Sequence, residues 1–255
     1  MKNTLRKKLE QGKKVFGTFA ELGGTNSVEA MGQAGLDYIV IDSEHGSFET
    51  ESMADMIRAC ELAGITPLCR VRELTRPAIM KLLDVGAGGL VIPDIESVEQ
   101  IYQILEYSKY APMGKRGYCG SRKDGWGYAF PDMSVADQMA YWNKETMIIP
   151  QCETVECLEH IEEITAIDGV DGIDIGPFDL SISMGIPGQF DNPEFVAAID
   201  RILHACKKNG KYAMAFTTQE SKINEYYDQG FEMVAYAMDA TVFIDAFKRL
   251  VNNIK

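Results

Sequence analysis

The chain lacks any run of about 18 apolar residues, so its sequence predicts no membrane-spanning helix. It is also short of basic residues, because 25 Lys and Arg stand against 38 Asp and Glu and leave a formal net charge of −13. Without a basic excess to neutralise phosphates, a nucleic-acid-binding function is disfavoured. The six cysteines show no C-x-x-C spacing, and the basic N-terminus lacks the apolar core of a signal peptide. We therefore expect reduced thiols and a cytoplasmic protein.

What the sequence does contain is a repeated alternation of short apolar runs with amphipathic segments. Alternation of this kind is typical of a parallel sheet with helical crossovers. Eight such units in 255 residues favour a single-domain (β/α)₈ barrel over a doubly wound sheet, and no Gly-x-Gly-x-x-Gly opens the first unit. A short N-terminal helix is expected to cover the barrel bottom. The predicted strands are 15–21, 37–42, 66–71, 89–94, 147–152, 171–175, 212–216 and 232–237.

One segment, residues 111–145, interrupts this alternation. It is turn-rich, and a segment of this length without regular structure inside a compact domain is usually functional or disordered. Its aromatic residues argue against disorder. We expect an ordered loop that lies over the active-site mouth or makes a subunit contact.

The end of the sixth predicted strand carries the first functional signal. Residues 171–175 are followed by a Gly-Pro break, and Asp179 comes just beyond it, where an α/β barrel keeps its chemistry. The fifth strand delivers Glu153 at the same end. Two carboxylates at a barrel mouth form a hard-oxygen site suited to Mg²⁺ or Mn²⁺. The sequence therefore predicts a metal-dependent enzyme.

Further polar residues follow the second and third strands. Asp42 and His45 are three residues apart, so the carboxylate could orient the imidazole and raise its basicity; alternatively, Asp42 only caps the turn. Arg70 could grip a carboxylate or an enolate oxygen, or form a structural ion pair with an inner carboxylate. Asp174 alternates with apolar strand residues and is not included in the predicted site. For Asp84, late in a helix, a structural salt bridge is expected.

Six short motifs along the chain form a set. They are 41–46 (IDSEHG), 83–87 (LDVGA), 91–93 (VIP), 114–117 (GKRG), 151–154 (QCET) and 175–185 (IGPFDLSISMG). Together they resemble the class II, metal-dependent pyruvate aldolases of the HpcH/HpaI type, which belong to the phosphoenolpyruvate/pyruvate barrel superfamily. This group includes the 2,4-dihydroxyhept-2-ene-1,7-dioate and 2-keto-3-deoxy-sugar-acid aldolases. The resemblance covers essentially the whole chain.

This resemblance implies a (β/α)₈ barrel, assembled as a homohexamer of dimers that exchange their last helix, with Mg²⁺, Mn²⁺ or Co²⁺ as cofactor. It makes Glu153 and Asp179 the metal ligands. His45 becomes the acid–base residue with Asp42 as its partner. Arg70 becomes the residue that fixes the keto oxygen of pyruvate and stabilises its enolate.

The resemblance also assigns secondary roles. Glu44 could position metal-bound water, and Asp84 could reach the site of a neighbouring subunit. No Schiff-base lysine is required, and the helical positions of Lys81 and Lys109 disfavour one. The backbone that would hold the pyruvate carboxylate is that of Gly176, Pro177, Phe178 and Asp179.

The implied reaction is cleavage of a small 4-hydroxy-2-oxoacid between C3 and C4, through a metal-stabilised enolate, to pyruvate and an aldehyde. One alternative is a carbon–carbon lyase that uses the same enolate, such as a citramalyl- or malyl-CoA lyase or an oxaloacetate decarboxylase. Another is a catalytically silent barrel. Three departures leave the aldehyde open: the charged pair Arg72 and Glu73, the bulky Phe178, and the less apolar segment 20–24, which contains Glu21.

Overall fold

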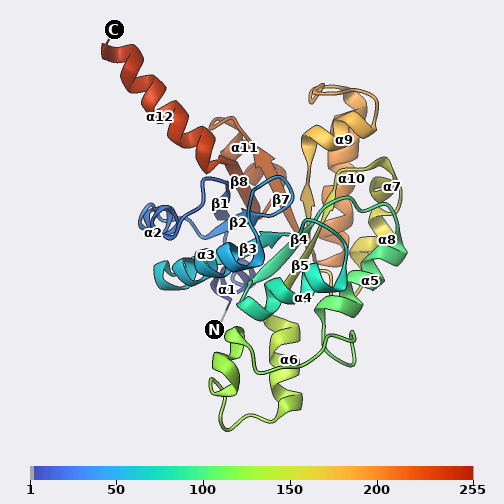
Figure 1. Cartoon of the computed structure of the whole chain (residues 1–255). Helices are drawn as coiled ribbons and strands as arrows, with labels where there is room; N and C mark the ends of the chain where they lie inside the picture. The colour runs from blue at the N-terminus through green and yellow to red at the C-terminus, as the bar shows by residue number, and fades with distance from the viewer. Residues whose placement is uncertain (1–2, 255) are drawn as a thin grey trace.

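The structure, a computed structural model, describes residues 3–254 and has eight parallel strands that close into a barrel in sequence order (Figure 1). The predicted (β/α)₈ barrel is confirmed. Neighbouring strands pair in parallel throughout, including β1 with β8, which closes the sheet. The strands are β1 (Val15–Ala20), β2 (Tyr38–Asp42), β3 (Thr66–Arg70), β4 (Gly89–Ile92), β5 (Met147–Cys152), β6 (Gly172–Ile175), β7 (Tyr212–Thr217) and β8 (Met233–Met238).

Local sequence explains where the crossover helices begin and end. Ser97 caps α5 in a reciprocal box with Gln100, and Thr75 caps α4. Gly64 and Gly86 end α3 and α4 in the left-handed conformation. The helices are α1 (Thr4–Glu10), α2 (Thr25–Gln33), α3 (Thr50–Ala63), α4 (Arg76–Val85), α5 (Val98–Ser108), α6 (Val135–Glu145), α7 (Val155–Glu159), α8 (Ile161–Ala166), α9 (Pro177–Ser183), α10 (Pro193–Asn209), α11 (Lys222–Gln229) and α12 (Asp239–Ile254), with a 3₁₀ helix η1 (Arg122–Gly127).

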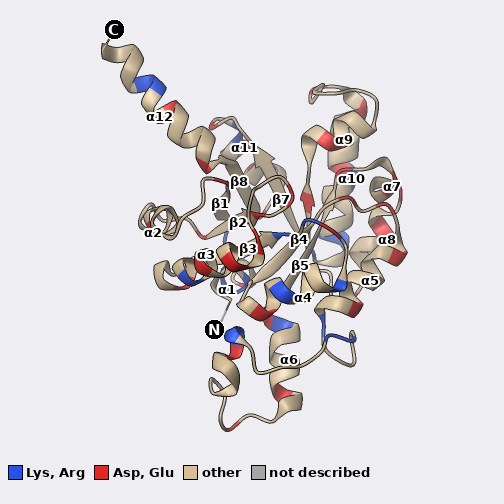
Figure 2. Cartoon of the chain, in the orientation of Figure 1, with Lys and Arg blue, Asp and Glu red and all other residues tan. Residues whose placement is uncertain are grey.

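The apolar core has two layers. Strand residues such as Ile39 and Ile173 pack outward against the helices, whereas Val40 and Met214 fill the barrel interior. Leu5 and Leu9 of α1 join the interior layer, so α1 closes the N-terminal end of the barrel as expected. The opposite end, where the strands end, stays available for polar side chains. Figure 2 shows acidic residues on most of the surrounding helices. No helix within residues 3–254 is long and apolar enough to cross a membrane.

The segment 111–145 is ordered, but it does not lie over the mouth of the barrel. It contains η1 and α6, and it packs at the N-terminal end of the strands (Figure 1). Arg122 donates to the Val85 carbonyl at the end of α4, and the Glu145 carboxylate accepts from the Asn3 amide. The expectation of a loop over the active site was therefore wrong, and the alternative, a subunit contact, stays a prediction. Aromatic content indicated order, but it carried no information on which end of the barrel the segment covers.

Helix α12 does not pack along the barrel as the other crossover helices do. It extends away from β8 (Figure 1), and within the described chain only its first residue, Asp239, is buried. Its large apolar side chains are exposed, and the rings of Phe243 and Phe247 contact each other in a tilted arrangement with centroids 4.9 Å apart. Exposed apolar residues occur along its whole length: Val242, Phe243, Ile244, Phe247, Leu250, Val251 and Ile254.

Candidate active site

The C-terminal ends of the strands surround a cavity of about 270 Å³. Residues predicted from separate strands, including His45, Arg70 and Asp179, line this one cavity. The barrel brings them together because parallel strands all end at the same face. Other lining residues are Phe19, Glu21, Gln151, Asp174, Ile175, Gly176, Pro177, Phe178, Phe216, Thr218 and Met238.

Asp42 and Arg70 form a buried, two-pronged ion pair at the base of this cavity. The Arg70 Nε donates to Asp42 Oδ1 at 2.9 Å, and its Nη2 donates to Oδ2 at 2.6 Å. Arg70 Nη1 lies 3.1 Å from Glu44 Oε2, and the guanidinium stands over the Phe19 ring. Burial opposes the charge, but the hydrogen bonds and charge of Asp42, with Glu44, raise the pKa of Arg70. The guanidinium is therefore charged and fixed in orientation.

Asp42 contacts the turn that carries His45 through its backbone, and the predicted pairing of Asp42 with the His45 imidazole stays a prediction. Asp42 Oδ1 accepts from the backbone N–H of Glu44 at 3.0 Å and of His45 at 3.4 Å. Among the described residues, no hydrogen bond joins the Asp42 carboxylate to the imidazole. Arg70, on the adjacent strand in register with Asp42, donates to both carboxylate oxygens. His45 is exposed on the tight turn and faces the cavity.

Glu153 is a buried carboxylate held from two sides. Its Oε1 accepts from the Asp94 N–H at 2.7 Å, and its Oε2 accepts from the Gln151 side-chain amide. Burial, together with the charges of Glu44, Asp179 and Asp174, raises the pKa of Glu153 to about 7. A positive charge close to Glu153 would therefore stabilise the ionised form of its carboxylate.

Gly176 has a packing reason to be glycine. A Cβ at this position would lie 2.7 Å from both Gln151 Nε2 and Glu153 Oε2. Because a side chain here would displace the Glu153 carboxylate, the Gly-Pro break allows α9 to start directly beside it. Asp179 lies in the first turn of that helix.

Sequence reasoning left out two buried side chains on this cavity. Asp174 is fully buried, and burial raises its pKa to about 7, although Arg70 opposes this. Gln151 lies in register with Asp174 on the adjacent strand. The alternation of Asp174 with the outward-facing Ile173 and Ile175 was a usable signal, because in a barrel strand it directs Asp174 into the interior.

The donor atoms at this end of the barrel fit a divalent cation. Asp174 Oδ1 and Gln151 Oε1 are buried acceptors without a hydrogen-bond partner in the described part of the chain. Carboxylate oxygens are the ligands that Mg²⁺ and Mn²⁺ prefer. Within residues 3–254, no three His, Cys, Asp or Glu side chains form a complete metal site. Asp179 lines the same cavity, and Glu153 is the buried carboxylate next to Gln151.

The remaining predicted residues lie elsewhere. Asp84 accepts from Arg116 Nη2 at 2.6 Å, which is the structural salt bridge that its sequence position indicated. Lys81 is exposed on α4. Lys109 is buried at the N-terminal end of the barrel, where burial lowers its pKa to about 8. No lysine of the described chain lines the cavity, so the geometry offers no Schiff-base nucleophile there.

Comparisons with known proteins agree with this arrangement. The model of the HpcH/HpaI aldolase/citrate lyase family matches residues 16–246. A hydroxypyruvate/pyruvate aldolase of Roseobacter denitrificans is 32% identical over 250 residues, which cover 97% of this chain and 95% of the relative. A 5-keto-4-deoxy-D-glucarate aldolase of Escherichia coli is 30% identical and covers 94% and 92%.

Solved structures of the same kind superpose on the whole barrel. An HpcH/HpaI aldolase from Desulfitobacterium hafniense has a TM-score of 0.91 and 30% identity, with 98% of this chain and 96% of that chain covered. The citrate synthase SbnG has a TM-score of 0.88 and 28% identity, with the same coverage.

Proposed function

The chain belongs to the HpcH/HpaI aldolase/citrate lyase family, and from this premise we propose that it cleaves a 4-hydroxy-2-oxoacid between C3 and C4 to pyruvate and an aldehyde. Its aldolase-named relatives indicate a carbon–carbon lyase. The observation that carries the proposal is the cavity at the strand ends, which Arg70, His45 and Asp179 line, with the buried Glu153 close enough to Asp179 for their charges to interact.

Glu153 and Asp179 would hold the divalent cation. When bound, such an ion supplies positive charge that offsets negative charge developing on a substrate oxygen. The identity of the ion is a further part of the proposal, and Mg²⁺, Mn²⁺ and Co²⁺ are the candidates. Glu44, beside Arg70 at 3.1 Å, would help to order water at this site.

Arg70 is the residue that would recognise the 2-keto oxygen of the substrate. As the C3–C4 bond breaks, its electron pair moves into the pyruvate enolate and places negative charge on this oxygen. A guanidinium already oriented by Asp42 needs no reorganisation to stabilise that charge. The backbone of Gly176, Pro177, Phe178 and Asp179 would hold the carboxylate of the pyruvate half.

His45 would take the proton from the 4-hydroxyl as the bond breaks. Its exposed ring faces the cavity, so it can exchange that proton with water after the aldehyde leaves. Protonation of the enolate at C3 then gives pyruvate. In the reverse direction, the same groups would activate pyruvate for addition to an aldehyde.

The first test is exchange of the pyruvate methyl hydrogens for deuterium, followed by NMR with purified enzyme in D₂O. We expect exchange that stops after chelation and returns on addition of Mg²⁺, Mn²⁺ or Co²⁺. This half-reaction reports enolate formation without knowledge of the aldehyde. Absence of exchange with every metal would contradict the proposed function.

We also propose that the chain assembles through α12. Within residues 3–254, the large apolar side chains of α12 from Val242 to Ile254 are exposed, and exchange with a second copy would cover them. A homohexamer built from such dimers is the expected assembly. A cytoplasmic location is part of the same proposal, and the six free cysteines are consistent with a reducing compartment.

A further inference from the structure

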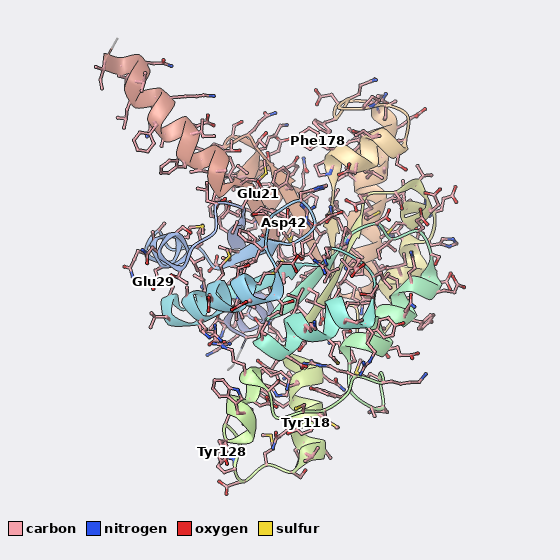
Figure 3. All side chains as sticks on the ribbon, viewed as in Figure 1. Glu21, Glu29, Asp42, Tyr118, Tyr128 and Phe178 are labelled. Carbon is pink, nitrogen blue, oxygen red and sulfur yellow. The ribbon has the colours of Figure 1, made fainter. Side chains whose placement is uncertain are left out.

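Glu21 stands at the outer part of the cavity, directly after β1. Its backbone N–H donates to Asp239 Oδ1 at 2.8 Å, and the Leu22 N–H donates to both oxygens of the same carboxylate. Asp239 thereby ties the end of β1 to the start of α12. The position of Glu21 is set through its backbone, and its side chain lines the cavity. Figure 3 labels Glu21, Asp42 and Phe178 at this same end of the barrel.

The charge of Glu21 has no partner in the described part of the chain. No hydrogen bond or ion pair within 4 Å reaches its carboxylate, since the nearby Arg70 is engaged by Asp42 and Glu44. Burial, then Asp42 and Asp239, raise the pKa of Glu21 against the opposing charges of Arg70 and His45. The surroundings of this carboxylate are therefore negative on balance, before any substrate enters.

The rest of this region of the cavity is apolar. The rings of Phe19 and Phe216 pack edge to face with centroids 5.6 Å apart, and Phe178 and Met238 lie on the same cavity. Thr218 is an uncharged polar residue on the same wall. No Lys or Arg other than Arg70 lines the cavity among the described residues. A second carboxylate on a ligand near Glu21 would thus meet a like charge and no Lys or Arg that is free to pair with it.

We propose that Glu21 determines specificity for the aldehyde half of the substrate, selecting an uncharged, hydroxyl-bearing aldehyde and excluding one that carries a carboxylate. The inference rests on the proposed function, because it concerns the partner that pyruvate gains or loses at this site. A hydroxyl group can donate to the Glu21 carboxylate, and the rings contact the carbon chain. A ligand carboxylate in the same place would be repelled and desolvated without compensation.

The test compares glyceraldehyde with tartronate semialdehyde, which carries a carboxylate in place of the terminal CH₂OH, in aldol addition to pyruvate with the metal that supports methyl exchange. The wild-type enzyme should favour glyceraldehyde in kcat/KM. Glu21→Gln keeps the size of the side chain and removes its charge. It should raise kcat/KM for tartronate semialdehyde about 10- to 100-fold and change that for glyceraldehyde by only a few-fold.

A matched control is Glu29→Gln, which removes the same charge from the exposed face of α2, away from the cavity (Figure 3). It should leave the ratio of the two kcat/KM values unchanged. Glu21→Ala, which retains the backbone N–H to Asp239, serves as a second variant should the Gln variant fail to fold. Either Glu21 variant should relax the discrimination.

Methyl exchange distinguishes a failure of the proposed function from a failure of the role proposed for Glu21. Exchange lacking in the wild-type enzyme would remove the proposed function itself. If exchange is intact in all variants but the Glu21 substitutions leave the ratio for the two aldehydes within about threefold of wild type, Glu21 does not set this specificity.

Discussion

The Arg70 guanidinium and the Asp42 carboxylate meet through two parallel hydrogen bonds of 2.9 and 2.6 Å between adjacent strands. Asp42 is fully buried, and its Oδ1 also accepts from the backbone of Glu44 and His45. The Asp42 carboxylate thus fixes the side chain of Arg70. It also fixes the turn that carries His45, through the backbone N–H groups of that turn. Asp42 is a positioning residue for both.

Asp42→Ala should lower the free energy of unfolding by about 3–5 kcal/mol, because it leaves the buried Arg70 charge without its main partner. Urea denaturation followed by circular dichroism measures this change. The control is Asp55→Ala, which breaks the exposed pair with Arg58 and should cost about 1 kcal/mol or less. Equal losses in the two variants would show that the buried pair has no special structural role.

Glu153→Gln and Asp179→Asn should each abolish metal-dependent methyl exchange, with a loss of at least about 10²-fold, while the fold is retained. The reason is that each change removes one of the two carboxylates proposed to hold the cation. Asp168→Asn, an exposed residue ahead of β6 at the other end of the barrel, is the matched control. Full exchange by either variant after chelation would overturn the metal assignment.

His45→Ala should reduce retro-aldol cleavage about 10²- to 10⁴-fold, as expected when a general base is removed. Methyl exchange should persist at a lower rate, because water that enters the cavity can replace His45 as the base for the methyl proton. His204→Ala on the exposed face of α10 is the control and should leave both rates unchanged. Unaltered cleavage in the His45 variant would exclude this residue from the mechanism.

Much of the fold could be predicted because each buried strand leaves a local pattern. The run at 37–42 is apolar, ends in an acid and precedes a turn, and the structure has β2 at Tyr38–Asp42. No local pattern indicated that the 111–145 segment packs at the N-terminal end of the strands. It depends on contacts of Arg122 and Glu145 with residues more than 30 positions away, which no local spacing shows.

The sequence indicated which polar residues follow the strand ends, but it did not indicate which of these side chains contact one another. Asp42 and Arg70 are 28 positions apart, and only the strand register places them face to face. Sequence proximity suggested His45 as a partner of Asp42, but it could not indicate the buried ion pair with Arg70. The alternation of Asp174 with Ile173 and Ile175 places it on the opposite face of the strand, but only closure of the sheet makes that face the barrel interior. The strand register and the side of the sheet to which each side chain points are properties of the closed barrel, so they are known only once the strands are aligned.

Lys109 predicts a dependence of stability on pH. Its Nζ donates to the carbonyls of Asn143 and Thr146, and burial lowers its pKa from 10.5 to about 8. Between these values the unfolded chain binds the proton and the folded chain does not, so folding stability rises with pH over this window. Relative to Lys109→Met, the wild-type protein should gain up to about 3 kcal/mol from pH 8 to 10.5. Urea unfolding of both proteins tests this, and a difference independent of pH would contradict it.

The exposed face of α12 predicts that assembly can be broken by one charge. Burial of Phe243 and Phe247 in a partner would contribute roughly 1.5–3 kcal/mol each, so Phe247→Glu should lower the molar mass measured by light scattering. Lys248→Glu introduces the same side chain at the adjacent polar position and should keep the assembly intact. Because Asp239 at the start of α12 binds the backbone of Glu21, dissociation should also lower kcat/KM at the cavity. An unchanged mass in the Phe247 variant would show that α12 is not the subunit contact.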